Sequence, residues 1–173
     1  MRYAVYAASS DDSRRFALGT IGKRTLFVVG INPHKATQET SDRTASLVEK
    51  VSARNGYDSF VLLNLYPVRS RTVTDLPQSP DQSAIHENRH RITNFLAKHQ
   101  QADLWVAWGN DILKRTFLVR EAAYLAVIAR SHGARCLHYG PLTKLGNPRH
   151  PSRLSFSWTF EPFTFPDRPN DGA

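Results

Sequence analysis

Apolar residues fall into blocks along the chain, and four of these blocks predict buried β-strands. The blocks are Thr25–Gly30, Ser59–Leu63, Asp103–Trp108 and Ala134–His138. Continuous apolar runs of this length are typical of strands that helices cover on both faces. Between the blocks, apolar residues recur with helical spacing over Ser41–Arg54, Gln82–His99 and Ile112–Ser131. This alternation of strands and helices predicts a parallel sheet with helices on both faces.

The two ends of the chain predict smaller additions to this sheet. Arg2–Ala7 and Arg14–Leu18 alternate around a polar turn and predict an antiparallel N-terminal hairpin. Leu154–Phe165 predicts an edge strand, and Pro166–Ala173 a disordered tail. We therefore expect one α/β domain over residues 1–165, a three-layer αβα fold whose four-stranded parallel sheet has the order 2-1-3-4, numbered by position of the blocks in the sequence.

Composition narrows the class of protein. The chain has 173 residues, no apolar run of membrane-spanning length and no signal-peptide pattern. Its single cysteine, Cys136, excludes an internal disulfide and predicts an inert buried thiol. His86 and His90 are one helical turn apart, but no third metal ligand accompanies them. We expect a cytoplasmic monomer without membrane contact, metal or other cofactor.

The net charge is +8, and arginine outnumbers lysine. This balance favours polyanionic partners, because the planar guanidinium group suits phosphate. Five basic residues fall in loops after the predicted strands and are candidates for binding nucleic acid: Arg69, Arg71, Lys144, Arg149 and Arg153. The predicted partner is DNA or another nucleic acid, or a free nucleoside or nucleotide. Alternatively, the charge contributes only to solubility.

Polar residues and turn-forming residues follow each of the predicted strands. Because ligands bind at the carboxyl ends of parallel strands, these residues are expected to meet in one crevice. The candidates for contact with a substrate are Gly30, Ile31, Asn32, Pro33, His34, Asn64, Tyr66, Trp108, His150 and Ser152. If they share one site, the pocket should fit a single planar base, at or below the small end of the ~300–1,000 Å³ range of ligand sites.

Each candidate has a functional and a structural interpretation. The Asn32 amide could position a water or an anomeric carbon, or Asn32-Pro33 could simply initiate a turn. The Asn64 amide complements the edge of a base, or it could be satisfied within a turn. His150, which lies between two prolines, could donate a hydrogen bond to a developing anion or only stiffen a loop. Tyr66 is the preferred residue for stacking on a base, whereas Trp108 is expected mainly to pack in the core.

Taken together, these motifs resemble a bacterial and phage family known as domain of unknown function 1643, over nearly the whole chain. The matching motifs are Asn32-Pro33, Asp42 with Thr44, Asn64-Leu65-Tyr66, Trp108-Gly109, and Leu142-Thr143-Lys144 continuing to His150-Pro151. That family brings no established activity.

A more distant resemblance is to the uracil-DNA glycosylase superfamily. It rests on Gly30-Ile31-Asn32-Pro33, Leu62-Leu63-Asn64, Trp108-Gly109-Asn110 and His150-Pro151-Ser152-Arg153-Leu154-Ser155. The resemblance implies that Asn32 positions the attacking water, Asn64 reads the base and His150 stabilises the departing base, so that an N-glycosidic bond is hydrolysed without a cofactor. Asn32 stands where a catalytic aspartate is usual, and the wedge that enters DNA is absent. A non-catalytic module that binds a base, nucleotide or nucleic acid is the alternative.

Overall fold

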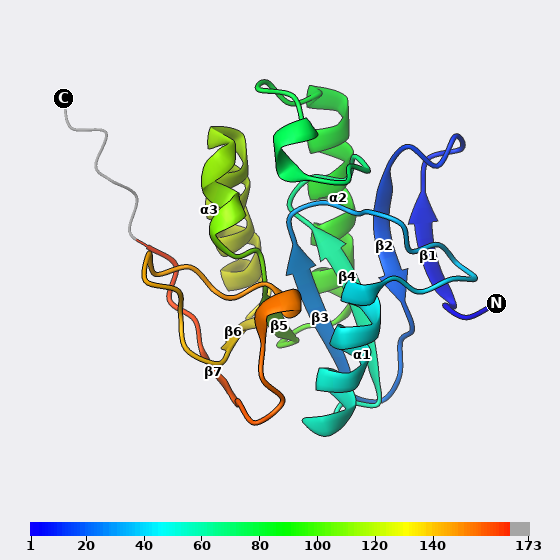
Figure 1. Ribbon diagram of the computed structural model, residues 1–173. Helices are drawn as coiled ribbons and strands as arrows, with labels where there is room; N and C mark the ends of the chain where they lie inside the picture. Colours follow the sequence, from blue (N-terminus) through cyan, green and yellow to red (C-terminus); the bar gives the residue numbers. More distant parts are fainter. Residues whose placement is uncertain (167–173) are drawn as a thin grey trace.

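One mixed sheet of seven strands organises the computed structural model, which describes residues 1–166. Its centre consists of β3 (Thr25–Gly30), β4 (Ser59–Asn64), β5 (Asp103–Val106) and β6 (Arg135–Tyr139). These strands are parallel and lie side by side in the order β4-β3-β5-β6 (Figure 1). This is the order that was predicted for the four apolar blocks.

The sheet as a whole is larger than the predicted four strands. The N-terminal hairpin of β1 (Val5–Ala8) and β2 (Arg15–Gly19) joins it, because β2 pairs antiparallel with β4. At the other edge, β7 (Phe160–Pro162) pairs antiparallel with β6. The predicted edge strand Leu154–Phe165 is therefore reduced to three residues. Part of the preceding segment forms a turn, in which the Trp158 N–H donates to the Ser155 carbonyl and the Ser157 N–H donates to the Ser155 hydroxyl.

Helices cover both faces of the sheet, as the sequence predicts. Helix α1 (Arg43–Arg54) lies on one face, and α2 (Gln82–Lys98) and α3 (Thr116–Ser131) lie on the other (Figure 1). Helix α3 begins later than predicted because a 3₁₀ turn occupies Asn110–Lys114. None of the helices in residues 1–166 is long and apolar enough to cross a membrane. Apart from Pro166, the predicted tail lies outside the described residues.

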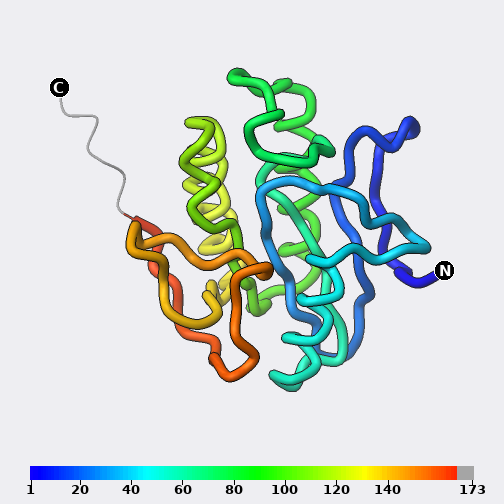
Figure 2. The backbone as a smooth tube through the Cα atoms, in the orientation of Figure 1, coloured from blue at the N-terminus to red at the C-terminus, as the bar shows by residue number. Residues whose placement is uncertain are grey.

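The alternation of side chains along β3 and β4 decides on which face of the sheet the polar residues at the strand ends lie. Leu26 and Val28 of β3, and Phe60 and Leu62 of β4, belong to the core on the α1 side. Since successive side chains alternate between faces, the same side receives the next positions, Gly30 and Asn64, which are paired in the sheet. The loop near residue 150 also reaches this edge, beside the loop that follows β3 (Figure 2).

Candidate functional site

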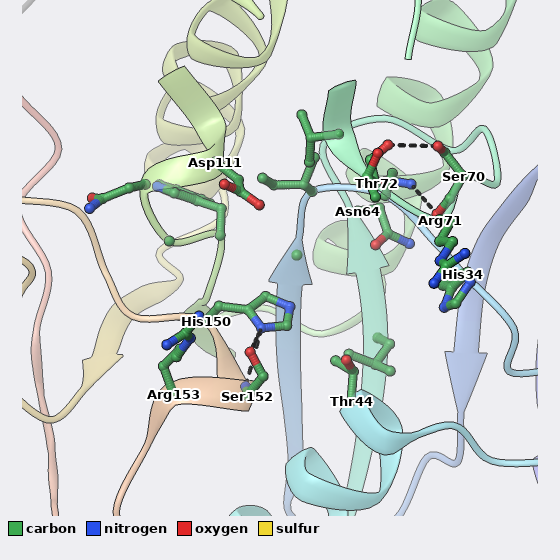
Figure 3. Close-up of a pocket in the computed structure, with 18 of the residues that line it drawn as sticks. His34, Thr44, Asn64, Ser70, Arg71, Thr72, Asp111, His150, Ser152 and Arg153 are labelled. Atoms are coloured by element: carbon green, nitrogen blue, oxygen red, sulfur yellow. Dashed lines mark hydrogen bonds between the residues drawn. The ribbon is translucent and has the colours of Figure 1, made fainter. Parts of the chain in front are cut away.

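A cavity of about 540 Å³ opens at the carboxyl edge of the parallel strands (Figure 3). Most of the predicted site residues line it: Gly30, Ile31, Asn32, His34, Asn64, Arg71, Trp108, Arg149, His150, Ser152 and Arg153. The predicted convergence of distant motifs is thus present in the fold. The cavity is larger than the predicted size of a single base and falls within the ~300–1,000 Å³ range of ordinary ligand sites.

Asn64 ends β4 and is the most deeply buried polar side chain predicted for this cavity. It is 4% exposed, and its Nδ2 is buried without a hydrogen-bond partner among residues 1–166. A buried amide in this state destabilises the protein by about 1–3 kcal/mol relative to a satisfied one. A ligand that carries acceptor and donor groups can satisfy it, as the edge of a base does.

Asn32 is half-buried, and its amide orientation is fixed by the backbone around it. Its Nδ2 donates to the carbonyl oxygens of Pro33 and Ser70, each at 3.2 Å, and of Val68 at 3.5 Å. Because carbonyl oxygens only accept hydrogen bonds, the nitrogen must face them and Oδ1 must face away. Oδ1 accepts no hydrogen bond from the part of the chain that the structure describes, and the residue lines the cavity. Asn32 therefore ties the loop after β3 to the loop after β4 and keeps a free acceptor within the described residues, and no turn is formed at Asn32-Pro33.

His150 presents one nitrogen to its own loop. Its Nδ1 accepts from the backbone N–H of Ser152 at 3.2 Å and lies 2.8 Å from the Ser152 hydroxyl. An acceptor nitrogen carries no proton, so the neutral imidazole carries its proton on Nε2. Burial lowers the pKa of His150 below its ordinary 6.5, against the opposing influence of Asp111 and Asp42. The side chain is therefore a neutral donor at physiological pH.

Gly109 allows the loop of His150 to approach the end of β5. It has a left-handed φ of +66°, and its N–H donates to the Pro148 carbonyl at 2.8 Å. A Cβ at this position would lie 3.3 Å from the Cβ of His150. The predicted backbone bend after Trp108 is confirmed, and it brings His150 to the cavity.

Two carboxylates that were not predicted as site residues also line the cavity, Asp42 from the Asp42 and Thr44 motif and Asp111. Asp42 caps α1 by accepting from the Ala45 N–H, and its other oxygen accepts from the Ala36 N–H. Asp111 is exposed and forms an ion pair with Lys114 at 2.8 Å. Figure 3 shows Asp111 and His150 on one side of the cavity and His34 and Arg71 on the other. No group of three His, Cys, Asp or Glu side chains within residues 1–166 is placed to hold a metal.

Tyr66 does not line the cavity, so its predicted role as a stacking platform is wrong. The side chain is 1% exposed and packs edge-on against Phe117, with ring centroids 5.0 Å apart. Its hydroxyl accepts from the N–H of Asp81, the residue that caps α2. Tyr66 thus belongs to the core on the α2–α3 side. Trp108 also packs, against Phe163 and Phe165, as expected, although it reaches the cavity wall.

Arg69 is another correction, because its guanidinium group is used inside the protein. It forms an ion pair with Asp12 and donates to the Tyr6 hydroxyl and to three backbone carbonyls. Lys144 is exposed and Pro33 is buried, and neither lines the cavity. Arg71 and Arg153 are exposed on the rim, while Arg149 donates to the Pro141 carbonyl and lies over the Trp158 ring.

Cys136 is half-buried in β6, outside the cavity lining. Burial raises the pKa of its thiol to about 11, so little thiolate exists at neutral pH. This agrees with the predicted inert thiol. His86 and His90 are exposed on α2, and His90 Nε2 lies 3.0 Å from the Asn94 amide nitrogen.

The fold and the cavity define an α/β protein with a cavity lined largely by polar residues at the carboxyl edge of its parallel strands. The family model described as "Protein of unknown function (DUF1643)" matches residues 15–152. The chain therefore belongs to this family, as its motifs predict. The matched segment extends from β2 to the loop of His150 and contains every lining residue of the cavity except Arg153. No curated protein and no solved structure matches the chain significantly.

Proposed function

We propose that this protein binds a base of a nucleic acid or nucleotide in the cavity and hydrolyses its N-glycosidic bond. The observation that carries the proposal is the presence, in one cavity, of a buried amide without a partner and a neutral imidazole. Asn64 supplies the amide and His150 the imidazole. The motif resemblance to the uracil-DNA glycosylase superfamily supports the same reaction.

The proposed chemistry assigns one task to each polar group. The oxygen of a water molecule bonds to the anomeric carbon while the bond from that carbon to the base nitrogen breaks. The bonding electrons leave with the base, and the Nε2–H of His150 donates a hydrogen bond to the negative charge that develops there. The Oδ1 of Asn32 accepts a hydrogen bond from the attacking water. The proton released by that water passes to solvent or to Asp111, and the base is finally protonated from solvent.

The size and charge of the cavity support a substrate larger than a free base. Its volume of about 540 Å³ leaves room for a sugar and a phosphate beside the base. Arg71, Arg149 and Arg153 lie in its lining, where they can contact phosphate groups. A base from nucleic acid would have to be extruded from its stack to reach Asn64.

A second candidate function is binding of the same base or nucleotide without hydrolysis. It is favoured by the state of the two carboxylates, neither of which is free to act as a strong general base. Both oxygens of Asp42 accept backbone N–H groups, and Asp111 is paired with Lys114. Asn32, where a carboxylate would activate water, has only an amide.

The two candidates are distinguished by incubating the protein with a panel of substrates. Single strands, duplexes and nucleosides that carry uracil, hypoxanthine, xanthine or alkylated bases are followed by mass spectrometry for the released base. Hydrolysis predicts release by the wild type and at least a ~10-fold slower rate for His150→Gln. Arg130→Gln, on the exposed end of α3, is the control and should retain the wild-type rate.

Binding without release would support the second candidate. For that case, the affinity for the same oligonucleotides should fall as salt rises, because basic residues of the cavity contact phosphate. If neither release nor salt-dependent binding is found with any member of the panel, both proposed functions are wrong.

A further inference from the structure

Arg15, on β2, is a cavity residue that the sequence did not single out. It is 3% exposed and lines the same cavity as Asn64. Arginine is almost never buried to this extent unless its charge is paired. The hydrogen bonds around Arg15 therefore show whether the protein itself satisfies this group.

Only some of the hydrogen-bond donors of the Arg15 guanidinium group have an acceptor in the protein. Its Nη1 donates to the Ala36 carbonyl at 3.0 Å, and its Nε is buried without a partner among residues 1–166. Arg15 takes part in none of the ion pairs within the described chain. It thus combines a buried positive charge with an Nε–H donor that no acceptor in the described part of the chain uses.

Arg69, which lies next to Arg15, makes the buried charge of Arg15 less favourable. Arg69 donates to the same Ala36 carbonyl, at 3.1 Å, but Arg69 is neutralised by its ion pair with Asp12. Burial and then the charge of Arg69 lower the pKa of Arg15 to about 10, so the guanidinium stays charged at neutral pH. The Asp42 carboxylate attracts this charge from nearby, but its oxygens bond to backbone N–H groups.

We propose that the Arg15 end of the cavity binds a phosphate group of the nucleotide whose base is held at Asn64. This inference rests on the proposed function and adds the second recognition element of the same ligand. A guanidinium group donates two parallel hydrogen bonds to phosphate oxygens, and such charge-assisted bonds are the stronger kind. The segment that contains His34 lies next to Arg15, which donates to the Ala36 carbonyl, and Figure 3 shows Arg71 beside His34. Both side chains add donor groups to this end of the cavity.

Of the two carboxylates that line the cavity, Asp42 lies near Arg15, but both of its oxygens already accept backbone N–H groups. Asp111 lies on the opposite side of the cavity from Arg71 and His34, near His150 (Figure 3). The ion pair of Asp111 with Lys114 and the neighbouring Arg153 offset its charge there, so the phosphate is assigned to the Arg15 end by Arg15 itself and not by repulsion.

Thermal unfolding with added inorganic phosphate or pyrophosphate tests the anion site without any catalytic readout. Both anions should raise the Tm of the wild type, since a ligand that binds only the folded state stabilises it. Arg15→Met should lose this response, and its Tm without anion should equal or exceed that of the wild type because an unpaired buried charge has been removed. Arg130→Met, which removes the same charge from an exposed site, should respond like the wild type.

Two further arms identify the source of the phosphate. A nucleoside 5′-monophosphate and a single strand without terminal phosphates are titrated against wild type, Arg15→Met and Arg15→Lys. Loss of charge should weaken binding roughly 10- to 100-fold, and lysine should restore only part of it because it lacks the planar fork. An effect on the monophosphate alone indicates a free nucleotide, and an effect on both indicates a backbone phosphate.

The proposal is overturned if the wild type responds to none of these phosphates, or if Arg15→Met responds as the wild type does. If the variant fails to fold, the Nε–H resonance of Arg15 in the wild type decides, since it must shift during the phosphate titration. Absence of base release with an intact phosphate response would reject hydrolysis and leave this anion site standing. Base release that is equally efficient in Arg15→Met would reject the anion site and leave the reaction.

Discussion

Replacing Asn64 with leucine should stabilise the ligand-free protein and weaken its binding of bases. Leucine has a similar size and removes an amide whose Nδ2 is buried without a partner in the described chain. Relief of one such group is worth about 1–3 kcal/mol, so the free energy of unfolding should rise by about 1 kcal/mol or more. For a chain of this size, that corresponds to an increase in Tm of about 2–4 °C.

The effect on base recognition should have the opposite sign. Leucine cannot donate to or accept from the edge of a base. Loss of a two-point contact of this kind is worth about 1–3 kcal/mol, which corresponds to a roughly 5- to 150-fold weaker preference for the cognate base. A gain in stability combined with a loss of recognition is typical of a residue retained for binding.

Asn88 provides a matched control. It is also buried, at 1% exposure, but its Nδ2 donates to the carbonyls of Asn64 at 2.8 Å and of Leu65 at 3.1 Å. Asn88→Leu would remove the donor for two buried carbonyls and should destabilise the protein by about 1–3 kcal/mol. Its own Oδ1 is unpartnered within residues 1–166, which offsets part of this loss.

Urea unfolding of the wild type and both variants, without ligand, measures the sign of each effect. Fluorescence titration with nucleosides then measures base preference. The reasoning is refuted if Asn64→Leu is destabilised as much as Asn88→Leu while its base preference is unchanged. In that case the Asn64 amide would be a structural group.

Three other changes test neighbouring parts of the site. The pKa of His150 is lowered in the folded protein, so the unfolded chain binds more protons as the pH falls below about 6.5. The stability of the wild type, measured by urea unfolding, should therefore fall relative to that of His150→Gln between about pH 7 and pH 5. Equal pH dependence of the two proteins would contradict a neutral His150. Gly109→Ala and Gly146→Ala should each lower the free energy of unfolding by about 1–2 kcal/mol, because both glycines have a left-handed φ. Only Gly109→Ala should also reduce base binding or release, because its Cβ would lie 3.3 Å from that of His150. Tyr66→Phe should lose about 1 kcal/mol with its hydrogen bond from Asp81 N–H and leave base preference unchanged, and a changed preference would restore Tyr66 to the site.

The central sheet could be predicted because its signal is local. Each buried strand is a continuous apolar run, and each run is separated from the next by enough helix for a right-handed crossover. Strand periodicity also explains why Gly30 and Asn64 both reach the cavity. The short strand β7 lacks such a signal, since its position depends on pairing with β6 and not on its own three residues.

The errors in the predicted site arise from long-range packing. Tyr66 follows a strand end, where alternation no longer fixes direction, and α2 captures its hydroxyl through Asp81. Arg69 follows a strand like the rim arginines, but Asp12, from the hairpin turn, neutralises it. Arg15 resembles a solvent-exposed residue of an edge strand in the sequence, and it is buried only because its strand joins the sheet and the segment around Ala36 covers it.

The central claim is that one cavity holds a nucleotide, with its base at Asn64 and its phosphate at Arg15. A crystal structure of the protein with a nucleoside 5′-monophosphate tests this most directly. The account predicts the base edge within hydrogen-bond distance of the Asn64 amide, the glycosidic bond facing His150 and the phosphate on Arg15. A nucleotide bound outside this cavity, or bound inside it with its phosphate beside Asp111, would contradict the account.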